Sequence, residues 1–166
     1  VCDVSGSVGA YARFMLMFLF SLTEVVSKIR AFVFSSYLGE VTNEFKGSNL
    51  ERAIESALSK YGGGSTDYGH SFSDFLSLCL DDIDKKTTVV ILGDARNNFG
   101  PDKAFLLKTI YERSKQVYWL NPEGKYRWNT GDSVMKTYSA YCTKVFECGT
   151  LQQLEKVIST LLKTAI

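Results

Sequence analysis

The run Thr87-Thr88-Val89-Val90-Ile91-Leu92 is the feature that most restricts the fold of this chain. It is short, continuous and rich in β-branched residues, which is typical of a central parallel strand buried on both faces. The run ends at Gly93-Asp94. Further strands are predicted at residues 30–35, 117–120 and 144–147. The more polar segment 39–45 is predicted to be an edge strand, paired antiparallel through a turn at residues 35–38.

Apolar residues recur at helical spacing between these strands. The predicted helices cover residues 8 to about 28, a Ser48 or Asn49 cap to about 60, 70–82, 101–114, 132–138 and 151–162. Pro101 is placed in the first turn of its helix. The alternation predicts an α/β fold whose mostly parallel sheet is covered by helices on both faces. The length of 166 residues fits a single domain over residues 1–166.

The first predicted helix is apolar on nearly every side over residues 14–20. Such a helix is either buried within its own domain or docks on a segment that lies outside this sequence. The run is too short to cross a bilayer, and neither a signal peptide nor a membrane span is predicted. Only Val1 and Cys2 precede the polar turn that follows. A buried strand has about five residues, so we expect the chain to have been cut within its first strand, from a longer protein.

Composition excludes several classes of protein. The apolar fraction of 45% indicates a globular chain, and a net charge of +1 with scattered Lys and Arg argues against nucleic acid as a partner. Cys142 and Cys148 fall in one predicted strand, where they would be about 20 Å apart and out of disulfide reach. No Cys-x-x-Cys pair suggests zinc. Four reduced thiols in a cytoplasmic protein are therefore expected.

The opening residues combine a carboxylate with two hydroxyls at alternate positions. Asp3, Ser5 and Ser7 lie where the first strand gives way to the first helix. A turn of this kind can direct three oxygen atoms at one point, and oxygen ligands suit magnesium. A plain Gly-Ser turn with a capping Asp explains the same residues equally well.

Two more polar positions are expected at the same edge of the sheet. Asp94 follows the central strand and Thr66 lies in the glycine-rich segment 61–69. Ligands of open α/β sheets bind at the carboxyl ends of the strands, and the neighbouring glycines permit close backbone approach. Two carboxylates and three hydroxyls form an oxygen-only set that suits Mg²⁺ or Mn²⁺ and is poor for zinc or copper. Such a set leaves the cation electrophilic and favours one more acidic ligand from outside.

Three non-adjacent stretches together resemble a known family. Asp3-x-Ser5-x-Ser7, Thr66 after a glycine run and Asp94 in Leu92-Gly93-Asp94 are similar to the metal-ion-dependent adhesion site (MIDAS) of von Willebrand factor A (VWA) domains. The resemblance covers essentially the whole chain. It implies a doubly wound, Rossmann-like sheet with one antiparallel edge strand. It also implies that all five residues bind the metal, Asp3 and Asp94 directly or through water.

Within that superfamily the chain most resembles the bacterial CoxE-like branch. The similarity lies in Cys2-Asp3-Val4-Ser5-Gly6-Ser7, Tyr11-Ala12-Arg13-Phe14, Phe32-Val33-Phe34-Ser35 and Trp119-Leu120-Asn121-Pro122. It implies a cytoplasmic protein that works beside a MoxR-type AAA+ ATPase in metalloenzyme maturation. The sequence departs from the family pattern at two places. Ser65 stands where a third loop glycine is usual, and Ala95-Arg96 follows Asp94 where glycine is common. Arg96 would put a cation near the metal, either lowering metal affinity or contacting the acidic ligand.

The leading hypothesis is a non-catalytic module whose magnesium ion captures a Glu or Asp of a protein partner. A metal-dependent hydrolase and an extracellular adhesion domain are the alternatives. No well-placed general base supports the hydrolase, and the chain has a single histidine, His70, expected to be a solvated cap residue or to touch the site. Tyr68, Arg127 and Trp128 are expected either at a binding rim or in ordinary loop packing. The glycine run lacks the Lys-Ser/Thr of a phosphate loop.

Overall fold

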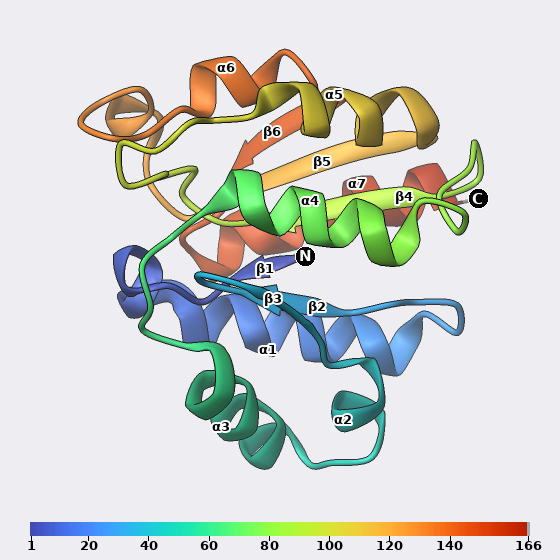
Figure 1. The fold of residues 1–166 in the computed structure, drawn as a ribbon. Coiled ribbons are helices and arrows are strands. Elements are labelled where there is room, and N and C mark those ends of the chain that lie inside the picture. The colour runs from blue at the N-terminus through green and yellow to red at the C-terminus, as the bar shows by residue number, and fades with distance from the viewer. Residues whose placement is uncertain (166) are drawn as a thin grey trace.

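One six-stranded sheet forms the centre of the molecule (Figure 1). The computed structural model describes residues 1–165, and side chains over residues 1–161. The strand order is β3-β2-β1-β4-β5-β6. Only β3 runs antiparallel to its neighbour, which confirms the predicted Rossmann-like fold with one antiparallel edge. The strands are β1 (Cys2–Asp3), β2 (Phe32–Phe34), β3 (Leu38–Glu40), β4 (Thr88–Leu92), β5 (Gln116–Asn121) and β6 (Lys144–Glu147).

Helices cover both faces of this sheet, with α4 in front of it and α7 behind it in Figure 1. The α-helices are α1 (Gly9–Val25), α2 (Thr42–Lys46), α3 (Leu50–Tyr61), α4 (Tyr68–Cys79), α5 (Ala104–Arg113), α6 (Met135–Ser139) and α7 (Leu151–Ala165). Two short 3-10 helices are η1 (Gly6–Val8) and η2 (Lys125–Arg127). Asn49 caps α3 by accepting a hydrogen bond from the backbone N–H of Arg52. This confirms one of the two caps that the sequence predicted.

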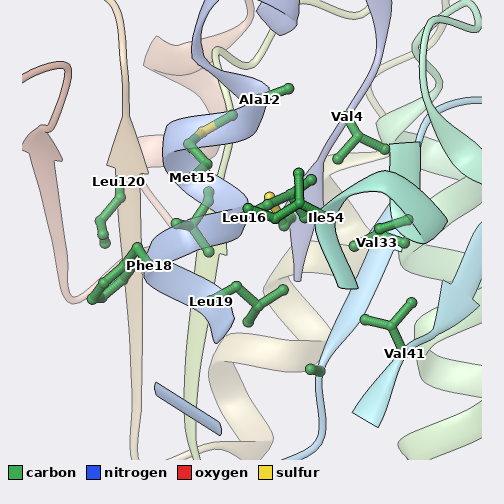
Figure 2. Close-up of a cluster of buried hydrophobic side chains, with 14 of the residues drawn as sticks. Val4, Ala12, Met15, Leu16, Phe18, Leu19, Val33, Val41, Ile54 and Leu120 are labelled. Atoms are coloured by element: carbon green, nitrogen blue, oxygen red, sulfur yellow. The ribbon is translucent and has the colours of Figure 1, made fainter. Parts of the chain in front are cut away.

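Alternation along the strands divides the core into two apolar layers. Val33 and Leu120 face the layer formed with α1, α3 and α7, which Figure 2 shows around Leu16 and Ile54. The neighbouring Trp119 faces the opposite layer, formed with α4, α5 and α6. The sheet is therefore buried on both sides, as the β-branched character of β4 predicts.

The apolar helix α1 is buried mainly within its own domain. Six of its residues are buried: Ala12, Met15, Leu16, Phe18, Leu19 and Thr23. Met17 and Val25 remain exposed. By length and composition alone, Gly6–Val25 meets the criterion for a membrane-spanning helix, as core helices of soluble proteins also do. Burial in the domain accounts for most of its apolar character.

The predicted strand at residues 39–45 is wrong in its second half. β3 ends at Glu40, and Thr42–Lys46 form α2 instead. Phe45 becomes fully buried there, with its ring 5.7 Å from that of Phe20 on α1. The Thr42 hydroxyl accepts a hydrogen bond from the backbone N–H of Ala31 and ends the strand pairing. The contact between Phe45 and α1 thus overrides a short polar alternation that is compatible with a strand or a helix.

The helix predicted from Pro101 starts three residues later. α5 begins at Ala104, after Lys103 in the left-handed conformation with φ of 46°. The side-chain amide of Asn97 donates hydrogen bonds to the carbonyls of Gly100 and Pro101, at 3.0 and 2.9 Å. These contacts fold residues 97–103 into a fixed loop rather than a first helical turn.

All four cysteines are free thiols, as expected. Cys142 and Cys148 lie just outside the two ends of β6. Burial raises the pKa of the Cys148 thiol to about 11, so it is un-ionised at neutral pH.

The sheet also fixes where a ligand can bind. The chain runs outward from β1 in opposite directions, through β2 on one side and β4 on the other. This arrangement opens a crevice at the carboxyl ends of β1 and β4. Gly93, which directly follows β4, makes the close approach possible: an added Cβ would lie 2.0 Å from the Tyr68 hydroxyl oxygen and 2.9 Å from the Asp3 Cβ.

Candidate metal centre

Three hydroxyl groups from two distant segments meet at the carboxyl edge of the sheet. The Thr66 hydroxyl donates a hydrogen bond of 2.6 Å to Ser5 Oγ. Ser7 Oγ lies 3.2 Å from Ser5 Oγ and 3.5 Å from Thr66 Oγ1. The structure therefore brings together the three hydroxyls that the sequence proposed as ligands.

Backbone hydrogen bonds hold the glycine-rich segment against the opening turn. The N–H of Gly63 donates to the Val4 carbonyl, and the N–H of Gly6 donates to the Gly64 carbonyl. Gly63 has φ of 75°, a conformation that favours glycine. The glycines therefore serve to bring Thr66 to Ser5. Ser65, which replaces a usual glycine, accepts a 2.9 Å hydrogen bond from the Asn98 side chain.

Asp3 is fully buried and held by two partners. Its Oδ1 accepts from the backbone N–H of Ser5 at 2.8 Å, and its Oδ2 accepts from the Tyr68 hydroxyl at 2.8 Å. The same Tyr68 oxygen accepts from the N–H of Ala95 at 3.2 Å. Tyr68 therefore connects the segment after β1 with the segment after β4.

Asp94 is buried but only partly satisfied. Its Oδ1 accepts from the backbone N–H of Arg96 at 2.9 Å. Its Oδ2 is buried without a hydrogen-bond partner among the described residues, and the Arg96 Nε is 4.0 Å away. Leaving a buried carboxylate oxygen without a partner is costly, so this atom is available to a cation or to water.

Burial raises the pKa values of both carboxyl groups. Burial, and after it the charge of Asp94, raise the pKa of Asp3 to about 7. The pKa of Asp94 rises to about 6, again mainly through burial. Two buried carboxylates that repel each other are stabilised when a cation neutralises them.

The donor set therefore fits a hard divalent cation. It offers two buried carboxyl groups, three clustered hydroxyls and an unpartnered carboxylate oxygen. Within residues 1–165 no group of three or more His, Cys, Asp or Glu side chains forms a metal cluster. A set of oxygen ligands with a small total charge suits magnesium, which usually keeps several waters and takes only one or two carboxylates.

Arg96 holds the segment after Asp94 to the loop that follows β5. Its Nη2 and Nη1 pair with Glu123 and Asp132, each at 2.9 Å. Its Nε donates to Glu123 at 3.2 Å, and the side chain is 14% exposed. All three nitrogens are thus engaged within the protein. These contacts give Arg96 a positioning role.

The other residues considered from the sequence are dispersed. Tyr68 is fully buried, which excludes the binding rim and leaves packing as the outcome of its two expected places. His70 is no cap: Asp67 caps α4, and the half-exposed imidazole lies 3.5 Å from Asp74 one turn along. Arg127 pairs with Glu123 at 3.3 Å, and the Trp128 Nε1 donates to the Glu123 carbonyl.

Comparison with known proteins identifies the family. The family model described as "VWA domain containing CoxE-like protein" matches residues 1–157. The chain belongs to this family. A solved structure of von Willebrand factor type A from Catenulispora acidiphila is similar in fold, with a TM-score of 0.63 at 13% identity. The match covers 99% of this chain and 40% of that one. No curated protein matches.

The sequence analysis of this CoxE-like VWA domain missed the residues that hold the candidate ligands. Asn121 donates to the Asp94 carbonyl at 3.2 Å, and Trp119 Nε1 donates to the Gly93 carbonyl at 2.8 Å. Asn97 accepts from the N–H of Tyr68 at 2.9 Å. Buried Asn side chains at strand ends are a signal that could have suggested this role, because such amides are nearly always hydrogen-bonded.

Tyr68→Phe is expected to lower the free energy of unfolding by about 1–3 kcal/mol, because it removes one hydrogen-bond partner from the buried Asp3 and one from the N–H of Ala95. Urea denaturation without metal measures this change. Tyr37→Phe, which removes a half-exposed hydroxyl bonded to the Lys60 carbonyl, is the matched control. Equal effects of the two substitutions would contradict the bridging role of Tyr68.

The metal-free domain is expected to become less stable as the pH rises from about 4 to 7. Asp3 and Asp94 have pKa values raised to about 7 and 6 in the folded state, against an ordinary value of 3.8. The folded protein therefore binds more protons than the unfolded one in this interval, and stability falls as they dissociate. Urea denaturation in EDTA at pH 5 and pH 8 measures the difference, and greater stability at pH 8 would refute it.

Proposed function

We propose that this VWA domain is a metal-dependent protein-binding module. Asp3, Ser5, Ser7, Thr66 and Asp94 would hold a magnesium ion, with manganese as a substitute. When bound, the cation would supply an electrophilic position that takes a Glu or Asp carboxylate of a partner. The observation that carries this proposal is the cluster of the Ser5, Ser7 and Thr66 hydroxyls, together with the buried Asp94, whose Oδ2 has no hydrogen-bond partner among the described residues.

The charge at the site supports capture of an anion. The five residues supply two negative charges at most, and Arg96 is already paired with Glu123 and Asp132. Hydroxyl oxygens are neutral, so a divalent cation at this site remains able to bind a further carboxylate. The first ligand segment also begins η1 and α1, whose partly positive N-terminal end favours negative charge.

We assign no catalytic step to the domain. The chain's one histidine, His70, is paired with Asp74 on the surface of α4, apart from the hydroxyl cluster. A hydrolase with the same ion would need a positioned base. If the domain were a hydrolase, it would turn over a generic phosphoester, and Asp94→Asn would lose this turnover.

Membership of the CoxE-like family supports a narrower role. In this proposal the domain is cytoplasmic and acts with a MoxR-type AAA+ ATPase in metalloenzyme maturation or in remodelling of a protein complex. The four free thiols agree with a reducing compartment.

Binding of the purified MoxR-type ATPase from the same organism tests this role. Because the ATPase itself needs magnesium, wild type and Asp94→Asn are compared at one magnesium concentration, by interferometry. We expect binding only to the wild type. Equal affinity of both proteins would refute metal-mediated capture.

A further inference from the structure

The loop that follows the candidate ligand Asp94 presents an aromatic ring to solvent. The Phe99 side chain is 82% exposed. Its φ is 57°, and the preceding Asn98 has φ of 50°. A bulky residue in the left-handed region is uncommon and costs free energy, and such strain concentrates at functional loops.

Hydrogen bonds fix this loop on both sides of Phe99. The N–H of Asn98 donates to Asp132 Oδ2 at 3.0 Å, and its side chain donates to Ser65 Oγ at 2.9 Å. Asn97 bonds the carbonyls of Gly100 and Pro101. The ring is therefore exposed on a held backbone, so ordering it on binding costs little entropy.

A hollow of about 270 Å³, lined mostly by residues with polar side chains, lies between this loop and the metal site. The candidate ligand Thr66 lines it, and so do the two neighbours of Phe99. Its full lining is Ser36, Ser65, Thr66, Asp67, Asn97, Asn98 and Gly100. Hydroxyl and amide groups of this kind suit the backbone of an extended peptide, which carries donors and acceptors at every residue.

Tyr126 in η2, which follows β5, is also a strongly exposed ring. Its ring lies against the backbone of its own loop, where a Cβ added to Gly124 would be 2.5 Å from it. Phe99, by contrast, follows directly on the segment that carries Asp94. It is therefore the better placed ring for a ligand held at Asp94.

We infer that Phe99 is the apolar anchor of the binding site. Its partner is an extended protein segment in which the metal-binding Glu or Asp is next to an aromatic or large aliphatic residue. The carboxylate binds at the metal centre, the backbone lies in the polar hollow, and the adjacent apolar side chain packs on Phe99. This inference rests on the proposed function and adds to it a sequence preference.

The test uses four capped peptides in NMR titrations of the domain with magnesium. They are acetyl-Gly-Glu-Phe-Gly-amide, the Glu-Ser analogue, and the two analogues with Gln in place of Glu. We expect the Glu-Phe peptide to bind about 3- to 10-fold more tightly than the Glu-Ser peptide, the range that one aromatic pair contributes. The Gln peptides should not bind.

Variants separate an anchor from a structural residue. Phe99→Ala should remove the preference for Glu-Phe over Glu-Ser and keep magnesium-dependent binding of both. Phe99→Gly should do the same without loss of thermal stability, because glycine adopts the left-handed conformation without strain. Tyr111→Ala, which removes an exposed ring from the far end of α5, should change nothing.

Different results would overturn the anchor role of Phe99 and the proposed function. Glu-Phe and Glu-Ser peptides binding equally to the wild type, or a preference that survives in Phe99→Ala, would overturn the role of Phe99 alone. No difference between Glu and Gln peptides would overturn the proposed function and the anchor with it.

Discussion

Replacing Asp94 with Asn is expected to abolish magnesium binding and, at the same time, to stabilise the metal-free protein. Asp94 is 1% exposed, and burial raises its pKa to about 6. At pH 8 it is therefore ionised at a cost to stability, and a neutral amide removes that cost. The amide oxygen can still accept from the N–H of Arg96. Magnesium affinity should fall by more than about 100-fold, since even groups behind the ligands contribute about 10- to 100-fold.

The opposite signs of these two effects distinguish a metal ligand from a residue that only supports the fold. Isothermal titration calorimetry gives the affinity, and thermal unfolding with magnesium or with EDTA gives both stabilities. Asp81→Asn, at an exposed position after α4, is the matched control and should leave both unchanged. A variant that loses stability in EDTA, or that still gains stability from magnesium, would contradict the assignment.

Arg96→Ala is expected to lower the free energy of unfolding by about 3 kcal/mol. The guanidinium is mostly buried and pairs with Glu123 and Asp132, so its loss leaves the buried Glu123 with only the half-exposed Arg127 as an ion-pair partner. Magnesium affinity should also fall, because the Arg96 side chain holds in place the segment whose backbone N–H orients Asp94. Arg96→Lys should rescue only part of the stability, since an ammonium cannot reproduce the forked contacts.

Urea denaturation measures these changes, with Arg13→Ala as the control. Arg13 pairs with Glu51 on the surface, where an ion pair contributes little. The double variant Arg96→Ala/Glu123→Gln should be more stable than Arg96→Ala, because it removes a buried charge that has lost its closest partner. Equal effects of Arg96→Ala and Arg13→Ala would show that the buried network has no structural role.

The sequence predicted the sheet well because its signals are local. The β-branched run that forms β4 needs no knowledge of its neighbours to be identified as a buried strand, and Asn49 is a recognisable helix cap. The wrong predictions fall in short polar segments. Phe45 packs on α1 and stabilises a helix over residues 42–46, and no local sequence pattern indicates this contact.

The candidate ligands could be named from the sequence, but the groups that hold them could not. Asp3, Ser5 and Ser7 lie at alternate positions of one short segment, and glycines mark the segments that carry Thr66 and Asp94. Tyr68 reaches Asp3 across 65 positions of the chain, and Arg96 reaches Glu123 across 27. Such pairings depend on strand order and register, which a single sequence does not contain.

Anomalous diffraction from crystals grown with manganese tests the central claim most directly. Mn²⁺ has the same preference for oxygen ligands as Mg²⁺ and scatters anomalously. We predict one strong anomalous peak within coordination distance of Ser5 Oγ, Ser7 Oγ and Thr66 Oγ1, close to Asp94 Oδ2, and no such peak in Asp94→Asn crystals. Crystals of the wild type without a peak among these atoms, at a manganese concentration that saturates magnesium sites, would contradict the account.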